Sequence, residues 1–168
     1  MDGHNRWTAA LHGALWRESP AWRVSEWERA LEDYHAGIVE PALGEIEILR
    51  PPERWYTLRL RDTARNVLDV RPLPRADIEP LVQEYGQTIQ QLVRVSSEAP
   101  LRGLEALDYA KRVLHDEGAL ALREGLGGWV HWEVSQARRF FTLFFLVASE
   151  LPEAWVRFHR HHGRHPSS

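Results

Sequence analysis

The amino-acid sequence predicts an α+β fold, in which helices pack against one face of a small antiparallel sheet. Two observations lead to this prediction. Apolar residues recur every three to four positions towards both ends of the chain, and they alternate with polar residues between positions 46 and 70. The expected order is two helices, three strands and three helices. A chain of 168 residues suits one domain with a substantial core.

A short amphipathic helix is predicted first, over residues 6–17, because apolar side chains lie at helical spacing until Pro20. We expect residues 1–24 to form a helical extension to a domain over residues 25–150. Tryptophan is enriched in protein interfaces, and this segment is rich in it. The candidate partner-binding residues are Trp7, Trp16 and Trp22.

A second helix is predicted to begin at Ser25, whose hydroxyl can cap it while Glu28 reaches back, and to end near Pro41. The hydrophobic period then changes to two, which predicts a three-stranded antiparallel meander. Residues 50–54 and 62–66 would form its connections. The residues expected to face the core are Ile46, Ile48, Tyr56, Leu58, Leu60, Leu68 and Val70.

Three more helices are predicted after the sheet. The first follows Asp77 as its cap, and the second runs from Pro100 to about Glu124 before three glycines. The core-facing residues expected in the second are Leu104, Leu107, Ala110, Leu114 and Ala121. The third, over residues 136–149, is apolar on nearly every side, which indicates a buried central helix.

Composition excludes several classes of function. The net charge of −3 argues against a dedicated nucleic-acid binder, and the absence of cysteine excludes disulfides and thiolate chemistry. No 18-residue apolar run or signal peptide is evident, so we expect a cytoplasmic protein. The phosphate-binding and nucleophile motifs G-x-x-x-x-G-K-[ST], G-x-G-x-x-G and G-x-S-x-G are all missing.

The middle strand presents Trp55, Arg59 and Arg61 on one face. An aromatic ring and arginines on a sheet can bind single-stranded nucleic acid by stacking and phosphate contact. The neighbouring strand carries Glu45 and Glu47 on the same side. We favour cross-strand ion pairs between these glutamates and the arginines.

A line of charged residues marks the helix over residues 100–124. Glu105, Asp108, Arg112 and His115 follow at spacings of 3, 4 and 3, which places them on one stripe of the helix. His115 is a candidate for moving a proton, with Asp108 or Glu117 setting its tautomer. The alternative is an ion-pair ladder from Asp108 to Arg112 that only organises packing.

Arginines from two helices extend this candidate site. Arg112, with Arg138 and Arg139, could clamp a carboxylate or phosphate, and Glu105 lies beside them. A metal site is favoured less, because the two-histidine spacing of HExxH is absent from this helix. We assign no cofactor.

The tail over residues 151–168 is predicted to be flexible and is rich in histidine and arginine. Imidazole suits Zn, Ni or Cu, but a tail without a rigid frame more often binds metal adventitiously. The weak metal candidates are His159, His161, His162 and His165.

Segments of the last two predicted helices resemble a known family. They are LEALD at 104–108, Arg112, LHDEGA at 114–119 and ARRFFTL at 137–143. These resemble the UPF0262 family of uncharacterised bacterial proteins, in which a LEAID…RR.LHNEGA helix precedes an ARRLFTL helix. Asp116 stands where that family usually has Asn. The resemblance covers residues 26–147 and is strongest over residues 78–147. It implies a cytoplasmic bacterial protein with helices closing over a small sheet. It implies no catalytic residue.

The sequence therefore favours a small cytoplasmic protein that acts by binding a protein partner or a second copy of itself rather than by catalysis. The alternative is an enzyme or sensor that holds a small anionic ligand in the His115 region. Nucleic-acid binding by the arginine face of the sheet is a third, less favoured hypothesis, and it predicts strongly salt-dependent binding.

Overall fold

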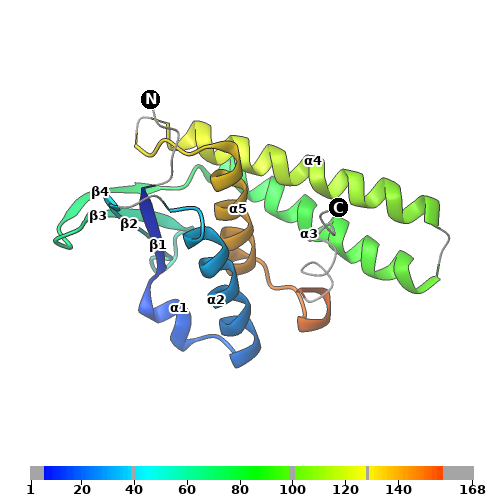
Figure 1. Ribbon diagram of the computed structural model, residues 1–168. Helices are drawn as coiled ribbons and strands as arrows, with labels where there is room; N and C mark the ends of the chain where they lie inside the picture. The colour runs from blue at the N-terminus through cyan, green and yellow to red at the C-terminus, as the bar shows by residue number, and fades with distance from the viewer. Residues whose placement is uncertain (1–5, 39–40, 99–100, 128, 157–168) are drawn as a thin grey trace.

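The computed structural model describes residues 6–38, 41–98, 101–127 and 129–156. A four-stranded sheet with the order β1-β2-β3-β4 lies at one end of the molecule, and the helices extend from one side of it (Figure 1). The predicted α+β class is confirmed. The predicted three-stranded antiparallel meander is wrong, because a fourth strand joins the sheet in parallel pairing.

That strand, β1, spans Trp7–Leu11, where the sequence predicts a helix, and it pairs with β2 (Gly44–Leu49). Ala9 and Leu11 are buried, so the segment also satisfies the alternation of a strand. Helix α2 covers the edge of β1 that faces away from β2, where the hydroxyl of Tyr34 donates to the carbonyl of Trp7 at 2.8 Å. The backbone of β1 is therefore hydrogen-bonded on one side by β2 and on the other by side chains of α2, which outweighs the helical spacing of the apolar residues.

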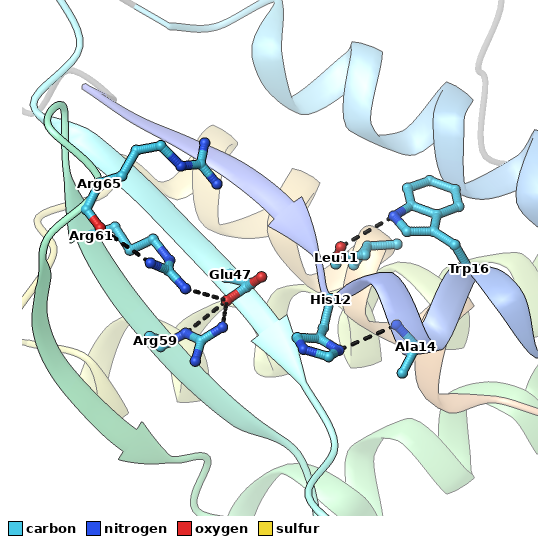
Figure 2. Close-up of polar contacts among 8 residues, drawn as sticks. All are labelled: Leu11, His12, Ala14, Trp16, Glu47, Arg59, Arg61 and Arg65. Atoms are coloured by element: carbon cyan, nitrogen blue, oxygen red, sulfur yellow. Dashed lines mark hydrogen bonds and ion pairs between the residues drawn. The ribbon is translucent and has the colours of Figure 1, made fainter.

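Only the short helix α1 (Gly13–Arg17) remains of the predicted first helix, and His12 caps it by accepting from the Ala14 N–H (Figure 2). The next helix, α2, spans Ala21–His35 and begins before the predicted cap Ser25. Pro20 serves as its N-cap residue without a side-chain hydrogen bond.

Strands β3 (Thr57–Asp62) and β4 (Val67–Pro72) complete the sheet in antiparallel pairing. Ile46, Ile48 and Leu58 are fully buried, which confirms the predicted core face of β2 and β3.

The predicted core face of β4 is wrong, because Leu68 and Val70 are about half exposed. An irregularity in the β3–β4 pairing explains the difference. Leu60 lies opposite Asp69, whereas Arg61 lies opposite Val67, so one extra residue enters β4 between them. Such a bulge turns the following side chains to the other face.

Three helices follow: α3 (Arg75–Glu98), α4 (Leu101–Gly125) and α5 (Val134–Ala148). Helix α5 lies between α2 and the α3–α4 pair (Figure 1). Its Phe140, Phe141, Phe144 and Phe145 are fully buried, which confirms the predicted central helix. None of the helices in the described residues is long and apolar enough to cross a membrane.

The buried face of α4 differs from the predicted one. Leu107, Leu114 and Ala121 are only partly buried, whereas Lys111, Gly118 and Leu122 are buried. Gly118 explains this rotation, because a Cβ there would lie 2.2 Å from Cε1 of Phe141. The absence of a side chain lets α5 approach α4 at this turn.

Candidate functional site

His115 lies where α4 meets α3 and α5, one turn before Gly118. Its ring packs against Tyr85 of α3 and Phe141 of α5, with centroid distances of 5.8 and 5.5 Å. Its Nε2 lies 2.7 Å from Oγ1 of Thr142, and Nε of Arg138 lies 3.5 Å from its Nδ1. The candidate proton carrier is thus held between aromatic rings and hydrogen-bonded through both nitrogens.

The hydrogen bonds around His115 select one tautomer. Thr142 donates its hydroxyl to the carbonyl of Arg138 at 3.1 Å, so its oxygen is left to accept. His115 then donates through Nε2–H, and its Nδ1 accepts from Arg138. Arg138 also forms an ion pair with Asp116 at 3.0 Å. We call His115, Asp116, Arg138 and Thr142 the His115 cluster.

The electrostatics of the His115 cluster favour neutral imidazole. Burial, followed by the nearby charge of Arg138, lowers the pKa of His115 to about 4. A general base works best with a pKa near the operating pH. Since both ring nitrogens are already hydrogen-bonded, the geometry suits packing better than proton transfer.

The sequence reasoning missed Lys111, which lies one turn before His115. Lys111 is 4% exposed, and its Nζ has no hydrogen-bond partner among the described residues. Burial lowers its pKa to about 8, partly offset by the charge of Asp108. The signal was available, because Lys111 is the only lysine in the chain and lies at i−4 from His115.

The remaining candidates on α4 do not converge with His115. Asp108 and Arg112 form the predicted i,i+4 ion pair at 3.6 Å on the helix surface. Glu105 and Glu117 are exposed. The proposed arginine clamp is not assembled, because Arg138 turns to Asp116.

Arg139 lies on a different side of α5. Its Nη1 would lie 2.7 Å from a Cβ placed on Gly37, next to the end of α2. Thus neighbouring arginines in the sequence serve different surfaces, and the three arginines do not surround a common ligand position.

The face of the sheet opposite the helices carries the predicted cross-strand pairs at Glu47, whereas Glu45 forms no ion pair with the described residues. Glu47 forms an ion pair with Arg59, whose Nε donates to Oε1 at 2.7 Å, and Arg61 approaches the same carboxylate at 3.7 Å (Figure 2). Trp55 does not join this face, because its ring packs against Phe144 of α5 at 5.5 Å. The aromatic ring required for the nucleic-acid hypothesis is therefore absent from the arginine face.

The candidate partner-binding tryptophans contribute to internal packing. Trp7, Trp16 and Trp22 are partly buried against the core. Trp16 also donates its Nε1 to the carbonyl of Leu11 at 3.1 Å (Figure 2). Its ring packs edge-on against Trp27. Their role in binding a partner stays a prediction.

No group of three or more potential metal ligands occurs within the described part of the chain. The tail candidates His159, His161, His162 and His165 lie outside the described residues. The structure therefore leaves the metal-binding role of the tail as a prediction from sequence.

Comparison with known proteins matches residues 49–149 to the model of an uncharacterised protein family, UPF0262. The chain belongs to the UPF0262 family. The matched region contains α3, α4, α5 and the whole His115 cluster, so the UPF0262 resemblance in these helices is confirmed.

Relatives within UPF0262 are similar over part of their length. A UPF0262 protein of Paramagnetospirillum magneticum is 33% identical over 54% of this chain and 63% of its own length. One from Maricaulis maris is 38% identical over 38% of this chain and 39% of its own length. One from Nitrobacter winogradskyi is 36% identical over 55% of this chain and 54% of its own length. This chain thus matches less than two thirds of each relative. No solved structure matches it.

Proposed function

We propose that this protein acts by protein–protein binding and that the outward side of α4 is its docking surface. The observation that carries the proposal is a row of apolar side chains on that side. Tyr109, Val113 and Leu120 are 65%, 36% and 51% exposed. Ala106 is also exposed, and we call these four residues the outer stripe.

The spacing of the outer stripe suits another helix. Ala106, Tyr109, Val113 and Leu120 occupy the a, d, a and a positions of consecutive heptads. The remaining d position, between Val113 and Leu120, is occupied by the polar residue Asp116, which pairs with Arg138. A stripe of this width is the seam by which two helices pack side by side.

The occupant that fits best is α4 of a second copy of this chain. An antiparallel pair about a two-fold axis at Val113 places Ala106 of each copy opposite Leu120 of the other. Small and large side chains then alternate along the seam, as close helix packing requires. Such an isologous contact also closes after two copies.

The expected affinity is modest. Covering the exposed half of one large apolar side chain is worth about 1 kcal/mol, so six of them contribute about 6 kcal/mol. Loss of translational and rotational freedom opposes association by a comparable amount, about 4 kcal/mol or more. We therefore expect a dimer that forms at high concentration and dissociates on dilution.

Binding is favoured over catalysis because the polar groups of the His115 cluster are hydrogen-bonded to one another, whereas the apolar side chains of the outer stripe are exposed to solvent. The proposal places the protein in the cytoplasm, as its sequence predicts. The alternative, a sensor for a small anion at His115, would require Arg138 to leave Asp116.

Sedimentation equilibrium over a wide range of concentrations tests the proposal. The parent chain should shift from monomer to dimer, and Leu120→Glu should remain a monomer because it buries a charged carboxylate against Ala106 of the second copy. Leu43→Glu is the matched control, since Leu43 is 47% exposed but lies before β2. A parent chain that stays monomeric, or a Leu120→Glu variant that still dimerises, would contradict the proposal.

A further inference from the structure

A small cavity lies at the end of the sheet where β1 and β2 begin and β3 ends. Its volume is about 210 Å³. It is remote from the outer stripe of α4, and neither it nor its residues belong to the His115 cluster. Its polar lining residues are Thr8, Glu45, Arg61, Asp62, Thr63 and Arg65.

Strand register places three of these residues in one row across the sheet. Thr8 of β1 lies opposite Glu45 of β2, and Glu45 lies opposite Arg61 of β3. Residues that are paired directly across strands project to the same face. The floor of the cavity is close-packed backbone at Gly44, where a Cβ would lie 2.0 Å from the carbonyl oxygen of Arg61.

Arg61 does not pair with the glutamate opposite it. Its Nη1 donates to the carbonyl of Arg65 at 3.1 Å, and its Nη2 lies 3.7 Å from Glu47 in the next row. Its Nε is buried and has no hydrogen-bond partner in the described part of the chain. The guanidinium of Arg61 is therefore incompletely hydrogen-bonded, and its side chain is 20% exposed, so its outer N–H groups can take a further acceptor.

Arg65 adds a second cation from the hairpin turn. Its φ of 69° lies in the left-handed region, where glycine is usual at this position of a hairpin. Its side chain extends over the sheet in the direction of β2 and β1 (Figure 2). Within the described residues its guanidinium forms no hydrogen bond or ion pair. Non-glycine residues held at positive φ are found often at ligand sites.

The two acidic residues of the cavity differ in whether their carboxylates are already hydrogen-bonded. Asp62 accepts from the Asn66 N–H at 2.8 Å and from Nδ2 of Asn66 at 3.2 Å, and these bonds lower its pKa. The carboxylate of Glu45 has no hydrogen bond or ion pair in the described part of the chain. The cavity therefore offers two cationic donor groups and one free carboxylate.

We propose that this cavity binds a small zwitterion, the chemical class of a free α-amino acid. The exposed N–H groups of the Arg61 and Arg65 guanidinium groups bind the carboxylate of the ligand. Glu45 binds its ammonium group, and the hydroxyl of Thr63 is available to either end. A simple anion would leave Glu45 unpaired beside it, whereas a zwitterion satisfies all three charged groups.

The volume restricts the size of that ligand. Drug-sized molecules occupy pockets of roughly 300 Å³ or more, whereas one water molecule takes about 30 Å³. A cavity of about 210 Å³ lies between these limits and fits a molecule with few heavy atoms. Amino acids with small side chains meet this requirement.

The proposal is tested by titrating the full chain with glycine, L-alanine, acetate and methylammonium. Calorimetry and the amide NMR signals of Thr63 and Arg65 report binding. We expect glycine and alanine to bind and each half-ligand to bind at least tenfold more weakly, since each lacks one charged contact. Arg65→Gly and Glu45→Gln should each weaken glycine binding by about tenfold.

Arg65→Gly is well suited to this test because it removes the guanidinium and relieves the positive φ, so it should leave the fold intact. Glu28→Gln, an exposed glutamate of α2, is the control for Glu45→Gln and should bind glycine like the parent. Absence of glycine binding would overturn the proposal. Acetate binding as tight as glycine binding, or unchanged binding by both cavity variants, would overturn it equally.

Discussion

Both sides of α4 depart in places from an ordinary amphipathic helix. The inner stripe, which faces α3 and α5, contains Lys111 and His115, whereas the outer stripe presents Tyr109, Val113 and Leu120 to solvent. The inner side therefore buries polar groups at a cost, and the outer side leaves apolar area uncovered. A helix with this arrangement meets two demands: it positions α5 on one side and, as we propose, a second copy on the other.

The largest expected effect concerns the closest contact of the inner stripe. Gly118→Ala should lower the free energy of unfolding by about 3 kcal/mol, because its Cβ would overlap Phe141. Alanine normally stabilises a helix relative to glycine by about 1 kcal/mol. Gly86→Ala in α3 is the matched control, since its Cβ would lie 3.8 Å from Phe145 and should stabilise. Urea denaturation gives the free energy of unfolding of both variants. Equal changes in the two would refute the close approach of α5 to α4 at Gly118.

The next effect is a pH dependence carried by His115. Its pKa is lowered from 6.5 to about 4 on folding, so the unfolded chain binds more protons in that interval. Stability should therefore fall as the pH drops from 6.5 towards 4, by about 2 kcal/mol from this residue. His115→Gln should show a smaller decrease over the same interval. Unfolding curves at several pH values compare the two, and parallel profiles would show that His115 is not buried as neutral imidazole.

A smaller effect of opposite sign is expected from Lys111. Lys111→Met replaces a buried amine that lacks a partner with an apolar chain of similar length, so it should stabilise the protein by about 1 kcal/mol at pH 7. Because the pKa is lowered from 10.5 to about 8, the parent should gain stability as the pH rises through this range. The variant should lack this gain. Thermal unfolding at neutral and alkaline pH measures both; a destabilised Lys111→Met would show that Nζ has a favourable contact.

The outer stripe should show the smallest effect on the isolated monomer. Leu120→Gln should change the free energy of unfolding by less than about 0.5 kcal/mol in dilute solution, because the leucine is half exposed. The same variant should weaken dimer formation in concentrated solution. If Leu120→Gln strongly lowered the free energy of unfolding in dilute solution, Leu120 would belong to the core and the outer stripe would not be a free surface.

Much of the fold was predictable from local patterns. The α+β class, the core faces of β2 and β3 and the central position of α5 follow from hydrophobic periodicity alone. Periodicity did not distinguish strand from helix at Trp7–Leu11, because both patterns fit five residues. It also failed in β4, where a single extra residue reverses the face of Val70.

The candidate site was predicted in part. The sequence placed His115 and Arg138 on neighbouring helices, and it predicted the Asp108–Arg112 ion pair. It did not single out Thr142, whose hydroxyl orients His115, because threonine within an apolar helix carries no distinctive signal. The assignment of Leu107 and Leu114 to the core missed the rotation of α4 towards Gly118.

The sequence by itself determined the class of fold, the extent of most elements, membership of UPF0262 and the absence of thiol chemistry. Only the tertiary structure decided the parallel strand β1, the burial of Lys111, the free Nε of Arg61 and the exposure of the outer stripe. The physical reason is that local patterns set the conformation of a segment through its own dihedral angles and periodicity. Burial and hydrogen bonding depend on contacts between residues far apart in the chain, such as Trp27 with Leu146.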